Sequence, residues 1–163
     1  MTLQDWGALG ELIGGVAIIV SLIYVASQIR QSTKAARAAT SQAFTDQYLR
    51  VVSPLQDPGF SEIYLRGLGG LHNLQGGEKP AFVSWIAVLL RLLESFYYQE
   101  KENALDSRLF DGWSTAFIDL FGNEGPREIL EIRKHWFDAQ FIEYFQDRLA
   151  KVAPKELYSK ADT

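Results

Sequence analysis

The chain has 163 residues, of which 47% are hydrophobic and 22% are charged, and this composition excludes global disorder. The net charge of -4 argues against nucleic acid as an electrostatic partner. The absence of cysteine excludes disulfides, thiolate nucleophiles and thiolate metal ligands.

The first predicted element is an apolar helix from Trp6 to Ile29. No charged residue lies between Glu11 and Arg30. At 1.5 Å per residue the helix is about 36 Å long, enough to cross a hydrocarbon core of about 30 Å. We therefore expect residues 1–34 to form a single transmembrane anchor in the lipid bilayer.

The charges around this helix predict its orientation. A cleaved signal peptide is one alternative, but it needs positive charge before the apolar run, where this chain has only acids. A strongly apolar core helix of a soluble protein is the other alternative. The basic residues Arg30, Lys34 and Arg37 follow the run. The positive-inside rule then places the N-terminus outside and the rest of the chain in the cytoplasm.

Small residues recur on one face of the predicted span, alternating three and four positions apart: Gly7, Gly10, Gly14, Ala17 and Ser21. Small side chains let two membrane helices approach closely, and a seven-residue repeat favours a left-handed crossing of about +20°. The stripe predicts helix packing, either in a homo-oligomer or against a larger membrane protein complex. Alternatively, small residues are simply common in membrane helices.

The acid Glu11 lies one residue from this stripe, at the outer margin of the span. A carboxylate in hydrocarbon is costly unless it has a partner or meets water. Glu11 could bond across an oligomer interface or line a pore. We favour the simpler interpretation that it reaches the outer headgroups.

Residues 11–33 read ELIGGVAIIVSLIYVASQIRQST. This segment resembles the opening helix of a group of bacterial single-pass membrane proteins of unknown function. Residues 64–68, residues 93–99 and the stretch around Trp136 also resemble that group. The resemblance implies an anchored helical architecture in the bacterial inner (cytoplasmic) membrane. It implies no activity.

The remaining chain predicts an all-α domain over residues 35–153, followed by a flexible tail over 154–163. The first helix should continue to Val52, and Phe44, Tyr48, Val51 and Leu55 form an apolar stripe at helical spacing at its end. Further helices are expected at 60–68, 80–103, 106–121 (capped by Asp106 or Ser107), 125–136 and after a cap at Asp138. The glycine-rich stretch 67–77 lacks a phosphate-binding lysine and is interpreted as a connector. A second membrane span at 80–99 is an alternative, but Arg91 and Glu94 favour a buried bundle helix.

No group of side chains predicts catalysis, a cofactor or a metal. Glu128, Glu131 and His135 share a helix face, yet they lack the Glu-x-x-His spacing of di-iron bundles, so a solvated face is favoured. Glu94 is interpreted either as a buried acid or as the partner of Arg91 in a pair at i, i+3. We therefore predict a non-catalytic membrane-anchored assembly protein. The alternatives are an oligomeric ion-conducting or transport-related pore, or a helical sensor or enzyme with an unrecognised pocket.

Overall fold

The computed structural model describes the backbone of residues 3–155 and the side chains of residues 7, 10, 11 and 13–155. All regular secondary structure in the described chain is helical, which confirms the all-α prediction. The side chain of Trp6 and most of the predicted tail lie outside the described residues. The α-helices are α1 (Leu3–Val52), α2 (Pro58–Leu68), α3 (Glu78–Lys101), α4 (Ser107–Phe121), α5 (Glu124–Arg133) and α6 (Ala139–Lys151); three 3-10 turns join them, η1 (Ser53–Gln56), η2 (Leu71–Asn73) and η3 (Lys134–Trp136).

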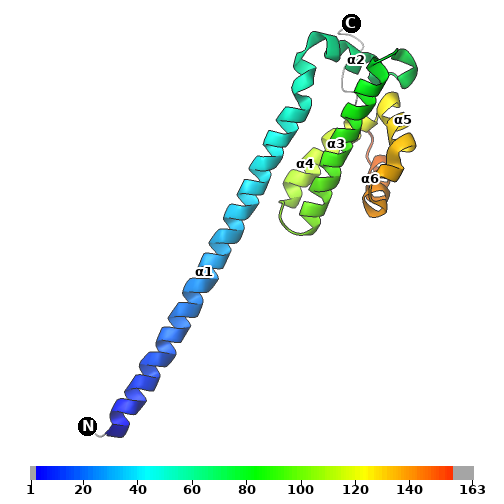
Figure 1. Ribbon diagram of the computed structural model, residues 1–163. Helices are drawn as coiled ribbons and strands as arrows, with labels where there is room; N and C mark the ends of the chain where they lie inside the picture. Colours follow the sequence, from blue (N-terminus) through cyan, green and yellow to red (C-terminus); the bar gives the residue numbers. More distant parts are fainter. Residues whose placement is uncertain (1–2, 156–163) are drawn as a thin grey trace. The chain divides into compact units, whose positions relative to one another are not determined.

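The chain divides into two units, Met1–Thr40 and Ser41–Thr163. The first unit is the N-terminal part of α1, a helix without interruption in Figure 1. Its most apolar stretch is long and apolar enough to cross a membrane, and none of that stretch is buried inside the protein. The second unit holds the hydrophobic core and is called the bundle below.

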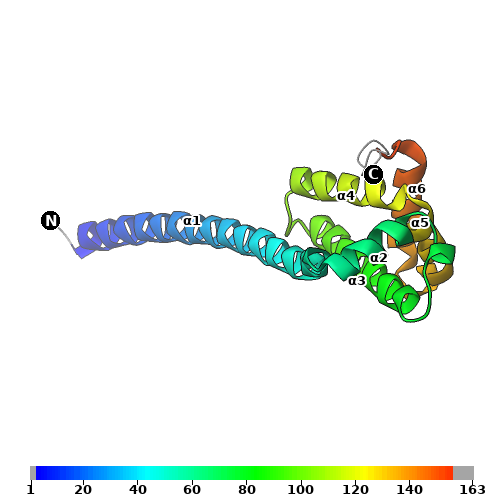
Figure 2. The ribbon, with the colours of Figure 1, turned by 90° about the horizontal axis from the view of Figure 1, so that it is seen from above.

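The central helix of the bundle is α3, which packs against α2, α4 and α5. Figures 1 and 2 both show α3 and α4 side by side. Phe82, Ile86, Leu90 and Leu93 follow one another at helical spacing and are fully buried. In the most apolar stretch of α3, 56% of the residues are buried, as a core helix requires. The prediction of a bundle helix at 80–99 agrees with this packing.

The last turns of α1 belong to the bundle. Phe44 is buried, and its ring lies 3.7 Å from that of Phe96, centroid to centroid. The ring of Tyr48 lies 4.5 Å from that of Trp113. In addition, the indole N–H of Trp85 donates to the carbonyl of Val51 over 2.7 Å. These contacts explain the apolar spacing at the end of the predicted first helix.

Aspartates begin three of the bundle helices. The carboxylates of Asp57, Asp106 and Asp138 accept hydrogen bonds from the first backbone N–H groups of α2, α4 and α6. Such bonds satisfy amides that have no partner within the helix. The caps predicted at Asp106 and Asp138 are therefore confirmed. The predicted fifth helix is shorter than expected, because its last residues form η3.

Helices α2 and α5 meet at two glycines, Gly67 and Gly125. A Cβ atom on Gly125 would lie 1.9 Å from the carbonyl oxygen of Gly67. A Cβ on Gly67 would lie 2.8 Å from the ring of Phe82. The two backbones and this ring therefore occupy the space that side chains would need. Gly67, which the sequence pattern places in a connector, is a packing residue in the last turn of α2.

Candidate functional site

The small-residue face of α1, which consists of Gly7, Gly10, Gly14, Ala17 and Ser21, is not covered by any other part of the described chain. A Cβ atom added at Gly7, Gly10 or Gly14 would meet nothing within 4 Å. Ala17 and Ser21, which continue the stripe, are also exposed. Packing within this chain therefore does not explain why small residues occur here. The face has room for a second helix backbone.

Two polar side chains of the apolar stretch, Ser21 and Gln28, form hydrogen bonds within their own helix. The hydroxyl of Ser21 donates to the carbonyl of Ala17 over 2.8 Å. Farther along, the amide of Gln28 donates to the hydroxyl of Tyr24 over 3.0 Å. These bonds lower the cost of placing the groups in an apolar environment. From Ile13 to Ile23, Ser21 is the one residue with a polar side chain, which leaves little to line a wet pore.

The charged residues that bear on topology are exposed, as are almost all other described side chains of the N-terminal part of α1. Glu11 is exposed, and so are Arg30, Lys34 and Arg37. About two and a half turns of helix separate Ser21 from the first of these cations, so the basic cluster follows the apolar stretch without overlapping it. Glu11 sits next to Gly10 on the helix, at the edge of the open face.

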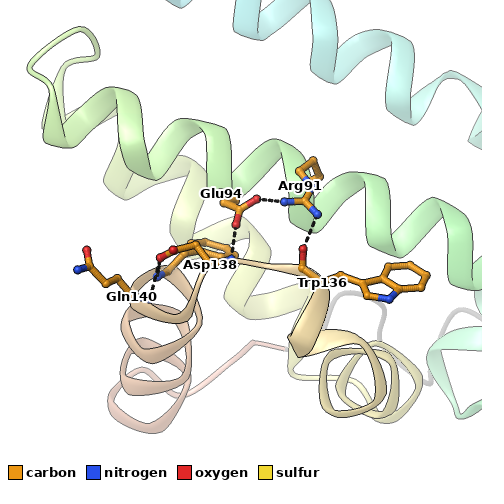
Figure 3. A network of polar contacts seen from close by, with 6 residues as sticks. Arg91, Glu94, Trp136, Asp138 and Gln140 are labelled. Carbon is orange, nitrogen blue, oxygen red and sulfur yellow. Dashed lines mark hydrogen bonds and ion pairs between the residues drawn. The ribbon is translucent and has the colours of Figure 1, made fainter.

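A buried acid, Glu94, joins α3 to the start of α6 (Figure 3). Its side chain is only 8% exposed. One carboxylate oxygen pairs with the guanidinium of Arg91, and the other accepts from the backbone N–H of Asp138 over 2.7 Å. Arg91 also donates to the carbonyl of Trp136 over 2.7 Å. The Arg91–Glu94 pair predicted from spacing is thus present, and it fixes the backbone on both sides of Phe137.

The same region contains a tyrosine–aspartate pair. The hydrogen bond from the hydroxyl of Tyr98 lowers the pKa of Asp138, and the backbone N–H of Gln140 adds to this effect. In return, the Asp138 carboxylate raises the pKa of Tyr98 to about 12. Arg91, Glu94 and Asp138 each have a hydrogen-bond partner in this region. Glu94 and Asp138 are therefore explained by the packing of α6 and offer no free acid or base.

A histidine and two glutamates lie together beside η2. The ligand atoms of His72, Glu124 and Glu128 all lie within 4.8 Å of one another. The His72 Nδ1 atom is 3.9 Å from a carboxylate oxygen of Glu124. Glu128 accepts from the backbone N–H of Leu71 over 3.3 Å. These contacts hold η2 against α5, and His72 and Glu124 are exposed.

The predicted helix face of Glu128, Glu131 and His135 does not form one cluster of ligand atoms in the described structure. Glu131 instead pairs with Lys134 over 2.7 Å and accepts from Gln146. His135 lies in η3, beyond the end of α5. Because the helix changes to a 3-10 turn after Arg133, the spacing expected for a continuous α-helix does not hold at His135.

A groove between the start of α3 and the end of α5 has a volume of ≈ 360 Å³. Its apolar walls come from Leu71, Pro80, Val83, Ile129, Ile132 and Trp136. Three polar side chains, Lys79, Ser84 and Arg133, complete it. The volume lies within the range of about 300–1,000 Å³ typical of small-molecule sites. Sequence reasoning missed this groove because its walls come from segments about fifty residues apart.

Comparisons with protein-family models, with curated proteins and with solved structures found no match in any of the three. The resemblance carried by residues 11–33 stays a prediction. A function for this chain therefore has to be inferred from its own residues: the open face of α1 and the features of the bundle.

Proposed function

We propose that this protein is a non-catalytic, membrane-anchored assembly protein. The N-terminal part of α1 crosses the bilayer, and its small-residue face packs against another helix. The partner helix belongs to a second copy of this chain or to a larger membrane complex. The bundle then stands on the cytoplasmic side of a bacterial inner membrane.

The observation that carries this proposal is the exposure of the apolar stretch of α1. Side chains such as Ile18, Leu22 and Ile23 are between 63% and 65% exposed. A row of such residues in water would be a large aggregation-prone patch, whereas lipid removes its cost. Because α1 also satisfies every backbone hydrogen bond internally along this stretch, it meets the main requirement for a membrane-spanning element.

The open glycine face supports assembly rather than a solitary anchor. Lipid tails are as apolar as leucine, so hydrophobic side chains give helices little reason to associate in a membrane. Close approach of backbones at Gly10, Gly14 and Ala17 supplies dispersion contacts that lipid cannot supply as well. The orientation follows from Arg30, Lys34 and Arg37, because the flanks of membrane helices that are rich in Lys and Arg stay on the cytoplasmic side.

The test replaces small residues on the stripe by leucine. We expect Gly14→Leu, alone or with Gly10→Leu and Ala17→Leu, to disperse the assembly in mild detergent, because leucine keeps the backbones apart. The mass of the protein–detergent complex is measured by light scattering, and proteins that co-purify are identified at the same time.

Gly15→Leu is the matched control. Gly15 is adjacent to Gly14 and equally open, with nothing within 4 Å of an added Cβ, but it lies about 120° from the centre of the stripe at 100° per residue. The control should keep the size of the wild-type assembly. An unchanged size for Gly14→Leu, or equal dispersal by Gly15→Leu, would refute packing through this face.

A further inference from the structure

Two cations that have no carboxylate partner among the described residues lie at the groove between α3 and α5. Six cations of the bundle have a carboxylate within 4.0 Å: Arg66, Arg91, Arg108, Lys134, Arg148 and Lys151. Among the residues that the structure describes, no such partner is present for Lys79 and Arg133, nor for Arg50, Lys101, Arg127 and Lys155. Of these six, Lys79 and Arg133 line the groove. Two such cations at one apolar groove make this part of the surface electrostatically complementary to an anion.

Arg133 is held in place without being neutralised. Its guanidinium lies over the ring of Trp136, with the carbon atom 4.4 Å from the ring centroid. Its Nε atom is buried and has no hydrogen-bond partner within the described protein. A guanidinium that is partly removed from water gains more from an anion than an exposed one does. The planar fork of arginine also matches a carboxylate geometrically.

The rest of the groove is apolar and partly open to solvent. Ile132 is 53% exposed and Trp136 is 47% exposed. Val83 and Ile129 contribute further apolar wall from α3 and α5. An apolar channel with cationic groups beside it is complementary to a molecule with an alkyl chain and one anionic head.

We propose that this groove binds an alkyl carboxylate, that is, a single-chain fatty acid. The alkyl chain lies along Val83, Ile129 and Ile132, and the carboxylate meets Arg133 and Lys79. One chain suits a volume of ≈ 360 Å³ better than the two chains of a phospholipid. A protein partner generally needs about 20–30 residues on each side, far more than line this groove.

The experiment uses the full chain in lipid nanodiscs and a twelve-carbon fatty acid that carries a photoreactive diazirine on its chain. After irradiation, mass spectrometry of peptides locates the label. We expect labelling of the segments 80–84 and 129–136. Laurate should compete with the probe, and dodecanol, which has the same chain without the charge, should not.

Variants distinguish recognition of the carboxylate from nonspecific binding of the alkyl chain. Arg133→Gln should reduce groove labelling at least tenfold, and Lys79→Gln should reduce it less. Lys134→Gln is the matched control, because it removes the neighbouring charge, which already pairs with Glu131, and should leave labelling unchanged. Lys79 is exposed in the first turn of α3, so its variant tests the proposal even if Arg133→Gln disturbs folding.

Three results would overturn the proposal. The first is label confined to the N-terminal part of α1, which would mean that the probe only partitions into lipid. The second is equal competition by dodecanol, which would make the groove a general apolar surface. The third is competition by dodecyl phosphate alone, which would assign the groove to a phosphate monoester. None of these outcomes depends on the assembly tested with Gly14→Leu.

Discussion

Replacing Glu94 by glutamine tests how α6 is held on the bundle. Glutamine keeps the size and one acceptor oxygen, but it loses the charge that strengthens the bonds to Arg91 and to the N–H of Asp138. Charge-assisted hydrogen bonds contribute about 1.5–3 kcal/mol, against about 1 kcal/mol for neutral ones. The bond to Arg91 is discounted because that side chain is 56% exposed. We expect Glu94→Gln to lower the free energy of unfolding by about 2 kcal/mol.

The assay is thermal and urea unfolding of the full chain in detergent. Unfolding is monitored by near-ultraviolet circular dichroism, because the aromatic side chains that give this signal belong largely to the bundle. The far-ultraviolet signal is dominated by total helix content, which includes α1. A loss of this size corresponds to a fall in Tm of roughly 8 °C for a unit of this length. Glu143→Gln, an exposed acid on α6, is the matched control and should change stability by less than about 0.5 kcal/mol.

A double-mutant cycle adds Arg91→Gln. If the buried pair acts as a unit, the two substitutions should be non-additive by about 1 kcal/mol or more. Glu94→Gln with the stability of the wild type, or strictly additive effects in the cycle, would refute the role assigned to this carboxylate.

Two further predictions concern the bundle. Gly125→Ala should destabilise it by about 3 kcal/mol in urea unfolding, because the new methyl group meets the backbone of Gly67. Gly112→Ala, in the interior of α4 with open space around it, should instead stabilise by about 0.5–1 kcal/mol, and equal losses for both would contradict the close crossing. The raised pKa of Tyr98 means that folding favours its neutral hydroxyl. The stability that this hydroxyl contributes is therefore complete below pH 10 and is lost as the pH rises to about 12. The lowered pKa of Asp138 gives the opposite pH dependence. The stability that its carboxylate contributes is present above pH 3.8 and is lost as the pH falls below that value. Tyr98→Phe should therefore flatten the alkaline limb of stability against pH, and an unchanged limb would assign it to other groups.

The sequence predicts the parts of this fold that depend on local pattern. The spacing of apolar residues in α3 and α6, and the caps at Asp106 and Asp138, depend on neighbours within a few positions, and they agree with the structure. The Arg91–Glu94 pair is also local, since one helical turn separates its members. Local rules are sufficient where the chain is close to itself in sequence.

Features formed by distant segments were not predictable. The second bond of Glu94 reaches Asp138, 44 residues away, and no spacing rule connects them. Gly67 looks like part of a flexible connector until its neighbour Gly125 is known. The groove beside Arg133 also needs the crossing of α3 and α5. Only the stacking of Arg133 on Trp136, three residues apart, leaves a signal in the sequence.

The bond between Glu94 and the N–H of Asp138 has a consequence for the order of folding. That amide precedes the first turn of α6, so no carbonyl of that helix is its partner, and its protection depends on a side chain from α3. Its rate of exchange with deuterium therefore reports the arrival of the C-terminal helix, separately from helix formation itself. Because this contact joins residues 44 positions apart, it forms only when α6 docks on α3, and its loss marks the detachment of α6 even where the helix itself stays formed.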